Sequence, residues 1–254
     1  MKRAVVTGAA SGIGLDCCAD LLARDWRVYA LDSSGESLAA ASQAFQSSAG
    51  NFVPIACDVA SSASVKSAFE QIGSDTASID ALICSAGIFR TGPLLETTEA
   101  DFDALFAVNT KGAWLAARSA LPLLEKAARS EAPTRIVFVA SAAAIRPKVG
   151  GGAYAASKAA LAQMTRVLAV EMARRFILVN AIAPATVDTP MTRALAAGSA
   201  TSGYKLSGVS PLGRIAQPSD VTSVIRFLLS SDANYLAGAI IPIDGGTSAA
   251  FDPG

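Results

Sequence analysis

Seven short apolar segments alternate with helical sequence along this chain, and this alternation limits the possible folds more than any other feature. The segments span residues 3–7, 27–31, 52–57, 81–84, 135–140, 177–182 and 239–243. Strands that are apolar throughout are typical of a parallel sheet covered on both faces, because a sheet with one wet face alternates apolar and polar residues. We therefore predict an α/β fold: a doubly wound sheet of about seven parallel strands with helices on both faces.

The length and composition favour a single domain. The chain has 254 residues, of which 52% are hydrophobic, and this is enough for one large buried core. No long linker, repeat or change of composition divides it, so we expect one domain over residues 1–254. Residues 191–209 are rich in Ala, Ser and Gly and lack a firm apolar face. We interpret the region of about 190–209 as a substrate lid, either a short helix or a mobile loop.

Small and polar residues stand where the apolar segments end. They are Gly8, Asp32, Asp58, Ser85, Ser141 and Pro184. In open parallel sheets, ligands bind beyond the carboxyl ends of the strands. The shared position of these residues predicts one binding site along that edge.

A glycine-rich turn, Gly8-Ala9-Ala10-Ser11-Gly12-Ile13-Gly14, follows the first strand directly and leads into a helix. Glycines let the backbone approach a pyrophosphate, and the N–H groups at the helix start attract its negative charge. The spacing is G-x-x-x-G-x-G, which differs from the general dinucleotide fingerprint. Its place between the first strand and the first helix indicates a dinucleotide site.

Asp32 ends the second strand, 18 residues after Gly14. A carboxylate at about this distance hydrogen-bonds the adenosine ribose in dinucleotide-binding folds, and it would repel the 2′-phosphate of NADP. No Arg or Lys stands in the glycine turn or just after Asp32, so we predict NAD as the cofactor. Alternatively, Asp32 caps the following helix. Asp58 has the same two interpretations, as a partner of the adenine amino group or as a helix cap.

Tyr154 and Lys158 lie four residues apart in an alanine-rich segment that we expect to be helical. At that spacing both side chains lie on one helix face. A protonated lysine favours the phenolate and lowers the pKa of the tyrosine, which suits a general acid/base in carbonyl and alcohol chemistry. Taken alone, the pair is better explained by a packing aromatic and a solvated charge, because Tyr and Lys at this spacing are common.

Charge and residue usage exclude several classes of function. Lys plus Arg and Asp plus Glu both number 21, so no basic excess points to nucleic acid or an anionic membrane. No apolar run is long enough to span a bilayer. Strand-like sequence from Arg3 leaves no room for a leader, and we expect a cytoplasmic protein. The chain has no histidine, and its cysteines lack metal-ligand spacing, so we expect no metal site. We interpret Cys17, Cys18, Cys57 and Cys84 as reduced thiols, mostly in the core.

Several motifs, in order and in register, resemble the short-chain dehydrogenase/reductase family over nearly the whole chain. Residues 7–14 resemble its cofactor turn, residues 180–191 its nicotinamide loop, and Asp244-Gly245-Gly246 its C-terminal signature. Asn109, Ser141, Tyr154 and Lys158 match its catalytic tetrad, and Ser141 precedes Tyr154 by 13 residues. The resemblance implies a Rossmann-type fold and hydride transfer between NAD and a secondary alcohol or ketone.

The resemblance also implies a role for each residue of the tetrad. Tyr154 would be the general acid/base, Lys158 would lower its pKa and bind the nicotinamide ribose, and Ser141 would bind the substrate oxygen. Asn109 would hold a water that links Lys158 to solvent. The residues expected to bind the cofactor are Gly8, Ser11, Gly12, Ile13, Gly14, Asp32, Asp58, Val59, Ser85, Ala86, Gly87, Tyr154, Lys158, Pro184, Val187 and Thr189.

The expected substrate pocket contains Ser141, Ala143, Val149 and Ala185. These residues are small or apolar, so we expect an uncharged or weakly polar alcohol or ketone. Alternatively, Arg90 and Arg146 face a carboxylate of the substrate. The family resemblance further implies a homotetramer or homodimer, built through the helices that carry Asn109 and Tyr154. The apolar residues Leu161, Met164 and Leu168 on the second helix could equally belong to the core.

The sequence departs from the family pattern at three places. Cys84-Ser85 replaces the usual Asn-Asn, Ala185 replaces the glycine after Pro184, and Phe176 stands where glycine is common. None removes a catalytic group. Two other functions remain open: an NADPH-dependent 3-ketoacyl carrier-protein reductase, against which Asp32 and the lack of a basic patch argue, and a cofactor-binding regulator without turnover, against which the complete tetrad argues.

Overall fold

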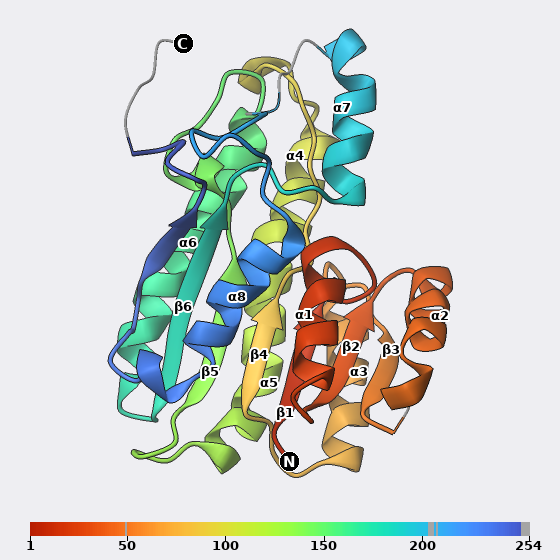
Figure 1. Ribbon diagram of the computed structural model, residues 1–254, viewed down its shortest axis with the longest axis vertical. Coiled ribbons are helices and arrows are strands. Elements are labelled where there is room, and N and C mark those ends of the chain that lie inside the picture. Colours follow the sequence, from red (N-terminus) through yellow and green to blue (C-terminus); the bar gives the residue numbers. More distant parts are fainter. Residues whose placement is uncertain (49, 203–205, 207, 250–254) are drawn as a thin grey trace.

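A single seven-stranded parallel sheet forms the centre of the computed structural model, which describes residues 1–48, 50–202, 206 and 208–249 (Figure 1). The strands follow the order β3-β2-β1-β4-β5-β6-β7, as expected for a doubly wound Rossmann-type fold. Their bounds are β1 Arg3–Thr7, β2 Arg27–Asp32, β3 Phe52–Ala56, β4 Ala81–Cys84, β5 Thr134–Val139, β6 Ile177–Pro184 and β7 Ile240–Ile243. The predicted fold class is confirmed.

Helices cover both faces of the sheet. The main helices are α1 Gly12–Leu22, α2 Gly35–Ala44, α3 Ser62–Asp75, α4 Glu99–Phe106, α5 Ala113–Ala127, α6 Gly152–Ala173, α7 Pro190–Ser202 and α8 Pro218–Leu228. Short helical turns, named η, lie between them. One core cluster joins the sheet to α3, α5 and α6, and a second cluster joins it to α1, α2 and α8. Figure 1 shows α1 and α8 in front of the sheet and α5 and α6 behind it.

The two core clusters explain why the strands are apolar throughout. Successive side chains of a strand point to opposite faces, so Val5 packs into the first cluster and Ala4 and Val6 into the second. All three residues are fully buried. A polar residue would be buried on either face, and the strands therefore carry the continuous apolar sequence that predicted the parallel sheet.

The carboxyl ends of the strands lie together along one edge, where the chain order reverses. β1 pairs with β2 on one side and with β4 on the other, with Thr7 aligned with both Leu31 and Cys84. This is the point at which doubly wound sheets bind ligands. In Figure 1 it is the upper edge of the sheet, and α7 stands beyond it.

Two segments differ in detail from the sequence analysis. The helical sequence between Thr98 and Arg129 is divided by a π-helical turn, η3, at Ala107–Gly112. The proposed lid region begins as helix α7, while residues 203–205 and 207 of it lie outside the described residues. Within the described part of the chain, no helix is long and apolar enough to cross a membrane, and all four cysteines are buried free thiols.

Candidate functional site

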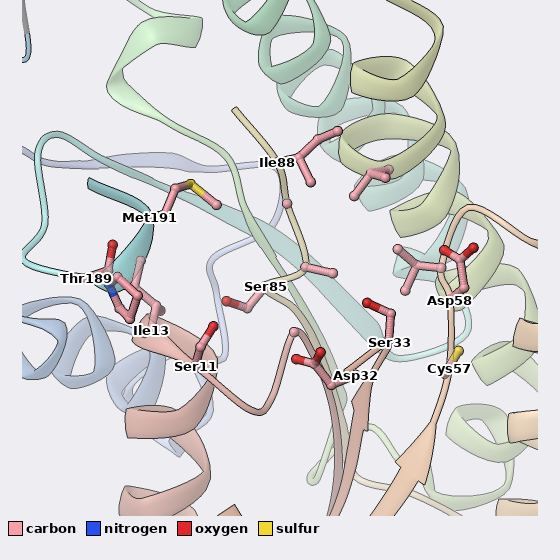
Figure 2. A pocket seen from close by; sticks show the side chains of 17 residues that line it. Ser11, Ile13, Asp32, Ser33, Cys57, Asp58, Ser85, Ile88, Thr189 and Met191 are labelled. Atoms are coloured by element: carbon pink, nitrogen blue, oxygen red, sulfur yellow. The ribbon is translucent and has the colours of Figure 1, made fainter. Parts of the chain in front are cut away.

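A cleft of about 270 Å³ lies along the carboxyl edge of the sheet, above β1, β2 and β4. Its lining consists of Gly8, Ser11, Gly12, Ile13, Asp32, Ser33, Cys57, Asp58, Val59, Ser85, Ala86, Gly87, Ile88, Val108, Thr189, Pro190 and Met191. Figure 2 shows Ser11 and Ile13 near Thr189 at one end, Asp58 at the other, and Asp32 and Ser85 between them. We call this the dinucleotide cleft.

The glycine turn is packed so tightly that two of its positions admit no side chain. Gly8 has a positive φ of 64°, and a Cβ there would lie 2.7 Å from the backbone of Ala86. A Cβ at Gly14 would lie 2.0 Å from the carbonyl oxygen of Gly8. These contacts bring the turn, the start of α1 and the end of β4 against one another, which forms the floor of the cleft.

The start of α1 suits an anionic ligand. Ser34, Ser61 and Thr98 cap α2, α3 and α4 with their side chains, whereas Ser11 is extended at the α1 N-cap and makes no such bond. The first turn of α1 also carries no acidic residue. Its N–H groups and the positive end of the helix dipole therefore lie at the cleft without a side-chain partner. This arrangement fits the pyrophosphate of a dinucleotide.

Asp32 is fixed at the centre of the dinucleotide cleft by two backbone groups. Its Oδ2 accepts a hydrogen bond from Ala10 N at 3.1 Å, and its Oδ1 accepts one from Ser34 N at 3.0 Å. The cap of α2 is Ser34, so capping does not account for Asp32. Asp58 likewise accepts from Ala60 N at 2.9 Å, while Ser61 caps α3. Both carboxylates line the cleft.

Lys158 is a buried cation that lies beside Tyr154. Its side chain is 4% exposed, and its Nζ donates a hydrogen bond to Val139 O at 2.8 Å. Burial lowers the pKa of the ammonium group to about 8, and a smaller interaction with Cys84 acts in the opposite direction. The Nζ lies 6.0 Å from the centre of the Tyr154 ring. At neutral pH the lysine is therefore mainly protonated, and its charge favours the phenolate.

Tyr154 and Ser141 lie where two further clefts meet. The first, which we call the inner cleft, has a volume of about 110 Å³ and is lined by Ser141, Tyr154, Lys158, Pro184 and Val187, among others. The second, which we call the outer cleft, has a volume of about 380 Å³. The residues that line both clefts are Ser141, Tyr154, Ala185, Met191 and Thr192. The inner cleft also shares Ile13, Ser85, Gly87, Ile88, Thr189 and Met191 with the dinucleotide cleft. The three clefts thus follow one another along the sheet edge, with the tyrosine between the second and the third.

Phe89 and Ser141 contribute contacts around the tyrosine. The rings of Phe89 and Tyr154 lie 4.3 Å apart between centroids. Ser141 begins the short turn η4, Ala142–Ala144, and its Oγ accepts a hydrogen bond from Ala143 N at 3.1 Å. This bond uses an acceptor position and leaves the hydroxyl hydrogen as a donor.

Asn109 lies inside the π-helical turn η3 and connects three parts of the site. Its side chain is 1% exposed; Oδ1 accepts from Ile88 N at 2.8 Å, and Nδ2 donates to Ile88 O and Ser157 Oγ, each at 3.0 Å. Ser157 Oγ in turn donates to Tyr154 O. The π-turn therefore anchors the segment after β4 to the helix of Tyr154 and Lys158. π-Turns within helices are frequent at functional sites.

Most predicted site residues line this series of clefts. Every residue expected to bind cofactor lines the dinucleotide or the inner cleft except Gly14, which acts through backbone packing. Ser141, Ala143 and Ala185 line the outer cleft. Val149 does not: it is 97% exposed, in a loop that turns at Gly150 with a φ of 80° and bonds to Gly92. This turn carries the Val149 side chain into solvent.

The structure also adds residues that the sequence analysis did not place in the site. Ser33, Cys57, Val108 and Pro190 line the dinucleotide cleft, and Val139 and Ala140 line the inner cleft. Lys148, Thr247 and Ser248 line the outer cleft, together with Arg146, which the sequence analysis had considered as the partner of a carboxylate. Val139 and Ala140 directly precede Ser141, so the strand-end argument could have found them. Thr247 and Ser248 come from the chain after β7, and no local signal marked them.

The three departures from the family pattern have local consequences. Cys84 is buried, with its Sγ 3.9 Å from Ala113 O, and burial raises the pKa of its thiol to about 12. Ala185 lines both the inner and the outer cleft, where its methyl group narrows the space. Phe176 has a φ of 56° and is thus in the left-handed region that glycine tolerates best.

Sheet topology, glycine turn and carboxylates together define a dinucleotide-binding protein of the Rossmann type. Comparison with known families gives the particular family: a model described as Enoyl-(Acyl carrier protein) reductase matches residues 8–248. The chain belongs to the short-chain dehydrogenase/reductase family, as the sequence motifs predicted. It is therefore an oxidoreductase that acts on CH–OH groups with a nicotinamide cofactor.

Individual relatives cover almost the whole chain. The 3-oxoacyl-[acyl-carrier-protein] reductase of Thermotoga maritima is 36% identical over 96% of this chain and 97% of its own. The cyclopentanol dehydrogenase of a Comamonas species is 32% identical over 98% of this chain and 97% of its own. Levodione reductase has a similar solved structure, with a TM-score of 0.89, 29% identity and 98% coverage of both chains.

The solved relatives differ in the cofactor that they contain. A 3-ketoacyl-(acyl-carrier-protein) reductase from Brucella melitensis was solved with NADH; its TM-score is 0.86, with 25% identity over 97% of this chain and 98% of its own. The RhlG protein of Pseudomonas aeruginosa was solved with NADP; its TM-score is 0.87, with 29% identity over 97% of this chain and 96% of its own. Similarity alone therefore does not decide between the two nucleotides.

Proposed function

We propose that this protein transfers hydride between NAD(H) and a secondary alcohol or ketone, with Tyr154 as general acid/base. The observation that carries the proposal is the position of Tyr154 and Ser141, which line both the inner and the outer cleft. A substrate in the outer cleft would meet them at the point where it approaches a nicotinamide in the inner cleft. When bound, the nucleotide supplies the hydride chemistry.

The protein's own groups would hold the substrate and handle the proton. In ketone reduction, Tyr154 Oη donates a proton to the carbonyl oxygen, and in alcohol oxidation it accepts the hydroxyl proton. Ser141 Oγ donates a hydrogen bond to the same oxygen and stabilises negative charge as it develops there. The buried ammonium of Lys158 makes the phenolate more accessible in both directions.

We propose that Asn109 positions these groups. Both hydrogens of its amide and one lone pair of Oδ1 are occupied by Ile88 and Ser157. A water that links Asn109 with Lys158 therefore stays a prediction, and it would have to use the remaining lone pair or the main chain.

Preference for NAD over NADP is the second part of the proposal. Two carboxylates, Asp32 and Asp58, line the dinucleotide cleft, and no Arg or Lys is among its described lining residues. A 2′-phosphate near Asp32 would meet like charge without a cationic partner.

Initial-rate kinetics with both nucleotides test this preference. We expect kcat/KM to be at least about tenfold higher with NAD(H), equivalent to about 1.4 kcal/mol. Asp32→Ala should narrow the ratio, whereas Asp16→Ala, a change of the same type on α1 outside the cleft lining, should not. Higher kcat/KM with NADP(H) would show that Asp32 does not select the nucleotide.

Tyr154→Phe tests the catalytic role. We expect turnover of any active alcohol or ketone to fall by about 10³-fold, because the proton donor is removed. NADH affinity, measured by fluorescence titration, should stay within about twofold. Tyr235→Phe removes the hydroxyl of a fully exposed tyrosine and serves as the matched control. Near-normal turnover by Tyr154→Phe would exclude the proposed acid/base.

The remaining parts of the proposal concern the whole chain. We propose that residues 1–254 form a single oxidoreductase domain that acts in the cytoplasm as a homodimer or homotetramer. The lid of about residues 190–209 covers the substrate: Met191, Thr192, Leu195 and Leu206 of this segment line the outer cleft. This position supports a lid that closes over bound ligand.

A further inference from the structure

Among the residues that the structure describes, the lining of the outer cleft carries charge of only one sign. Its described lining consists of Phe89, Ser141, Ala142, Ala143, Arg146, Pro147, Lys148, Tyr154, Ala185, Thr186, Met191, Thr192, Leu195, Leu206, Thr247 and Ser248. Two of these residues, Arg146 and Lys148, are cationic, and none is acidic. The dinucleotide cleft shows the opposite pattern, with two carboxylates and no cation among its described lining.

Arg146 lines the outer cleft and is held there by a main-chain contact in place of an ion pair. Arg24, Arg175, Arg193, Arg214 and Arg226 each form an ion pair with a carboxylate at 3.2 Å or less. Arg146 forms none with the part of the chain that the structure describes. Its Nη1 instead donates to Thr247 O at 2.6 Å, which fixes the guanidinium to the segment after β7. Its other N–H groups remain suited to a second acceptor.

Lys148 lies close enough to Arg146 for the two charges to interact. The pKa of Lys148 is lowered from its ordinary value, first by partial burial and then by repulsion from Arg146. An anion bound at this cleft wall would interact favourably with both cations. Oxyanions are the usual partners of arginine, whose fork geometry matches two acceptor oxygens.

We propose that the substrate of this enzyme carries a carboxylate or sulfonate group, which Arg146 and Lys148 bind while the reacting carbon lies at Ser141 and Tyr154. This inference rests on the proposed function, since it names the substrate class for the same site. It replaces the expectation of an uncharged substrate, which was based on the small and apolar residues of the pocket, and it adopts the alternative that Arg146 faces an anionic group. Arg90, the other cation considered there, pairs with Asp101 at 3.3 Å and does not line the outer cleft.

The apolar remainder of the cleft fits the rest of such a substrate. Phe89, Met191, Leu195 and Leu206 line it together with the two cations. A volume of about 380 Å³ accommodates a short carbon skeleton between the anionic group and the reacting carbon. The cations would then select substrates by the distance between these two groups.

Isothermal titration calorimetry on the protein saturated with NADH tests anion binding without any need for turnover. The probes are hexanoate, hexane-1-sulfonate and the neutral hexanamide. We expect the two anions to bind at least about tenfold more tightly than the amide, a difference of about 1.4 kcal/mol. Equal affinity for the three probes would overturn the proposal.

Variants test whether Arg146 and Lys148 cause the preference for anions over the neutral amide. In Arg146→Gln/Lys148→Gln the preference should fall to about twofold or less, whereas Arg146→Lys should retain most of it. Arg90→Gln is the matched control, since it removes an exposed cation outside the cleft, and it should leave the preference unchanged. A preference that survives in the double variant would assign anion binding elsewhere and overturn the proposal.

Turnover separates this inference from the proposed function. We expect 5-oxohexanoate to be reduced with at least about tenfold higher kcat/KM than its methyl ester. Equal reduction of both would support the oxidoreductase and overturn the anion site. Anion-selective binding, without reduction of any ketone in a broad panel by either nucleotide, would support the anion site and overturn the proposed function.

Discussion

Burial of Lys158 creates a conflict between stability and function at a single residue. A charged ammonium is costly to bury, and Lys158 is 4% exposed with one carbonyl partner, Val139 O. Its pKa of about 8 is below the ordinary value of 10.5. Between these two values the unfolded chain binds more protons than the folded chain, so this residue's contribution to stability rises with pH. At neutral pH the site keeps its cation at the expense of stability.

Lys158→Met should therefore stabilise the cofactor-free protein more at pH 7 than at pH 10. The stability difference between the variant and the wild type should shrink by up to about 3 kcal/mol over this range, because the pKa of Lys158 falls from 10.5 to about 8 on folding. Urea unfolding at both pH values measures it. The variant lacks the hydrogen bond to Val139 O at both pH values, so the loss of this bond cancels when the two stability differences are compared. Parallel stability profiles for the two proteins would contradict the prediction.

Phe176 is a second residue at which the conformation opposes the side chain. Its φ of 56° is unfavourable for a residue with a Cβ by about 1–2 kcal/mol, and 45% of it is exposed. Phe176→Gly should raise the free energy of unfolding by about 1 kcal/mol, as measured by chemical denaturation. Asp25→Gly is the matched control at a φ of 59°; its gain should be smaller, because aspartate tolerates this region better. Destabilisation by Phe176→Gly would indicate that its partial packing outweighs the strain.

At the scale of elements, the π-helical turn η3 matters because it fixes Asn109 between Ile88 and Ser157. Asn109→Ala would leave these buried groups without partners and should lower stability by about 2–3 kcal/mol. We also expect kcat to fall at least tenfold with little change in the KM for NAD, since the turn positions the helix of Tyr154 and Lys158. Steady-state kinetics and urea unfolding provide the two measurements.

Asn180→Ala is the control for a purely structural effect. Asn180 is equally buried, and it bonds to Leu236 O and Ala239 N away from the clefts. Its variant should lose similar stability but keep kcat. A comparable loss of kcat in both variants would show that η3 contributes only to folding.

The bounds of an element could be predicted where a single feature of the sequence determines them. β1 and β4 have the predicted bounds, because each is a short apolar run with clear ends. The glycine turn could be recognised because its spacing is local. Asn109, Ser141, Tyr154 and Lys158 were assigned through the family resemblance, and their catalytic roles stay a prediction. The π-turn was not predicted, because one extra residue in a helix leaves the apolar pattern almost unchanged.

Val149 was placed wrongly in the substrate pocket, since the direction of its loop depends on Gly150 and on a contact with Gly92. The positive charge of the outer cleft could not be predicted from the sequence, because the cleft is formed by residues 146–148 and residues 247–248, which only the tertiary structure brings together.

At the scale of the whole molecule, electrostatics is divided along one edge of the sheet. Formal charges sum to zero over the chain, yet the dinucleotide cleft is lined by Asp32 and Asp58 and the outer cleft by Arg146 and Lys148. Net charge, which argued only against nucleic acid and membrane partners, could not reveal this division. The cations of the outer cleft would attract an anionic substrate to that end of the edge. The dinucleotide, which is also an anion, would instead be held at the other end by the N–H groups at the start of α1.

The last prediction concerns assembly. The inner faces of α5 and α6 belong to the core, with Leu161 1% exposed, whereas Val167 and Val170 on α6 are 49% and 79% exposed and Trp114 on α5 is 40% exposed. Exposed apolar residues on neighbouring helices are typical of subunit interfaces. Val170→Asp should shift the protein to a smaller species, measured by size-exclusion chromatography with light scattering. Ala39→Asp adds the same charge to an exposed position on α2 and should not. A wild-type monomer, or an unchanged assembly in Val170→Asp, would exclude this interface.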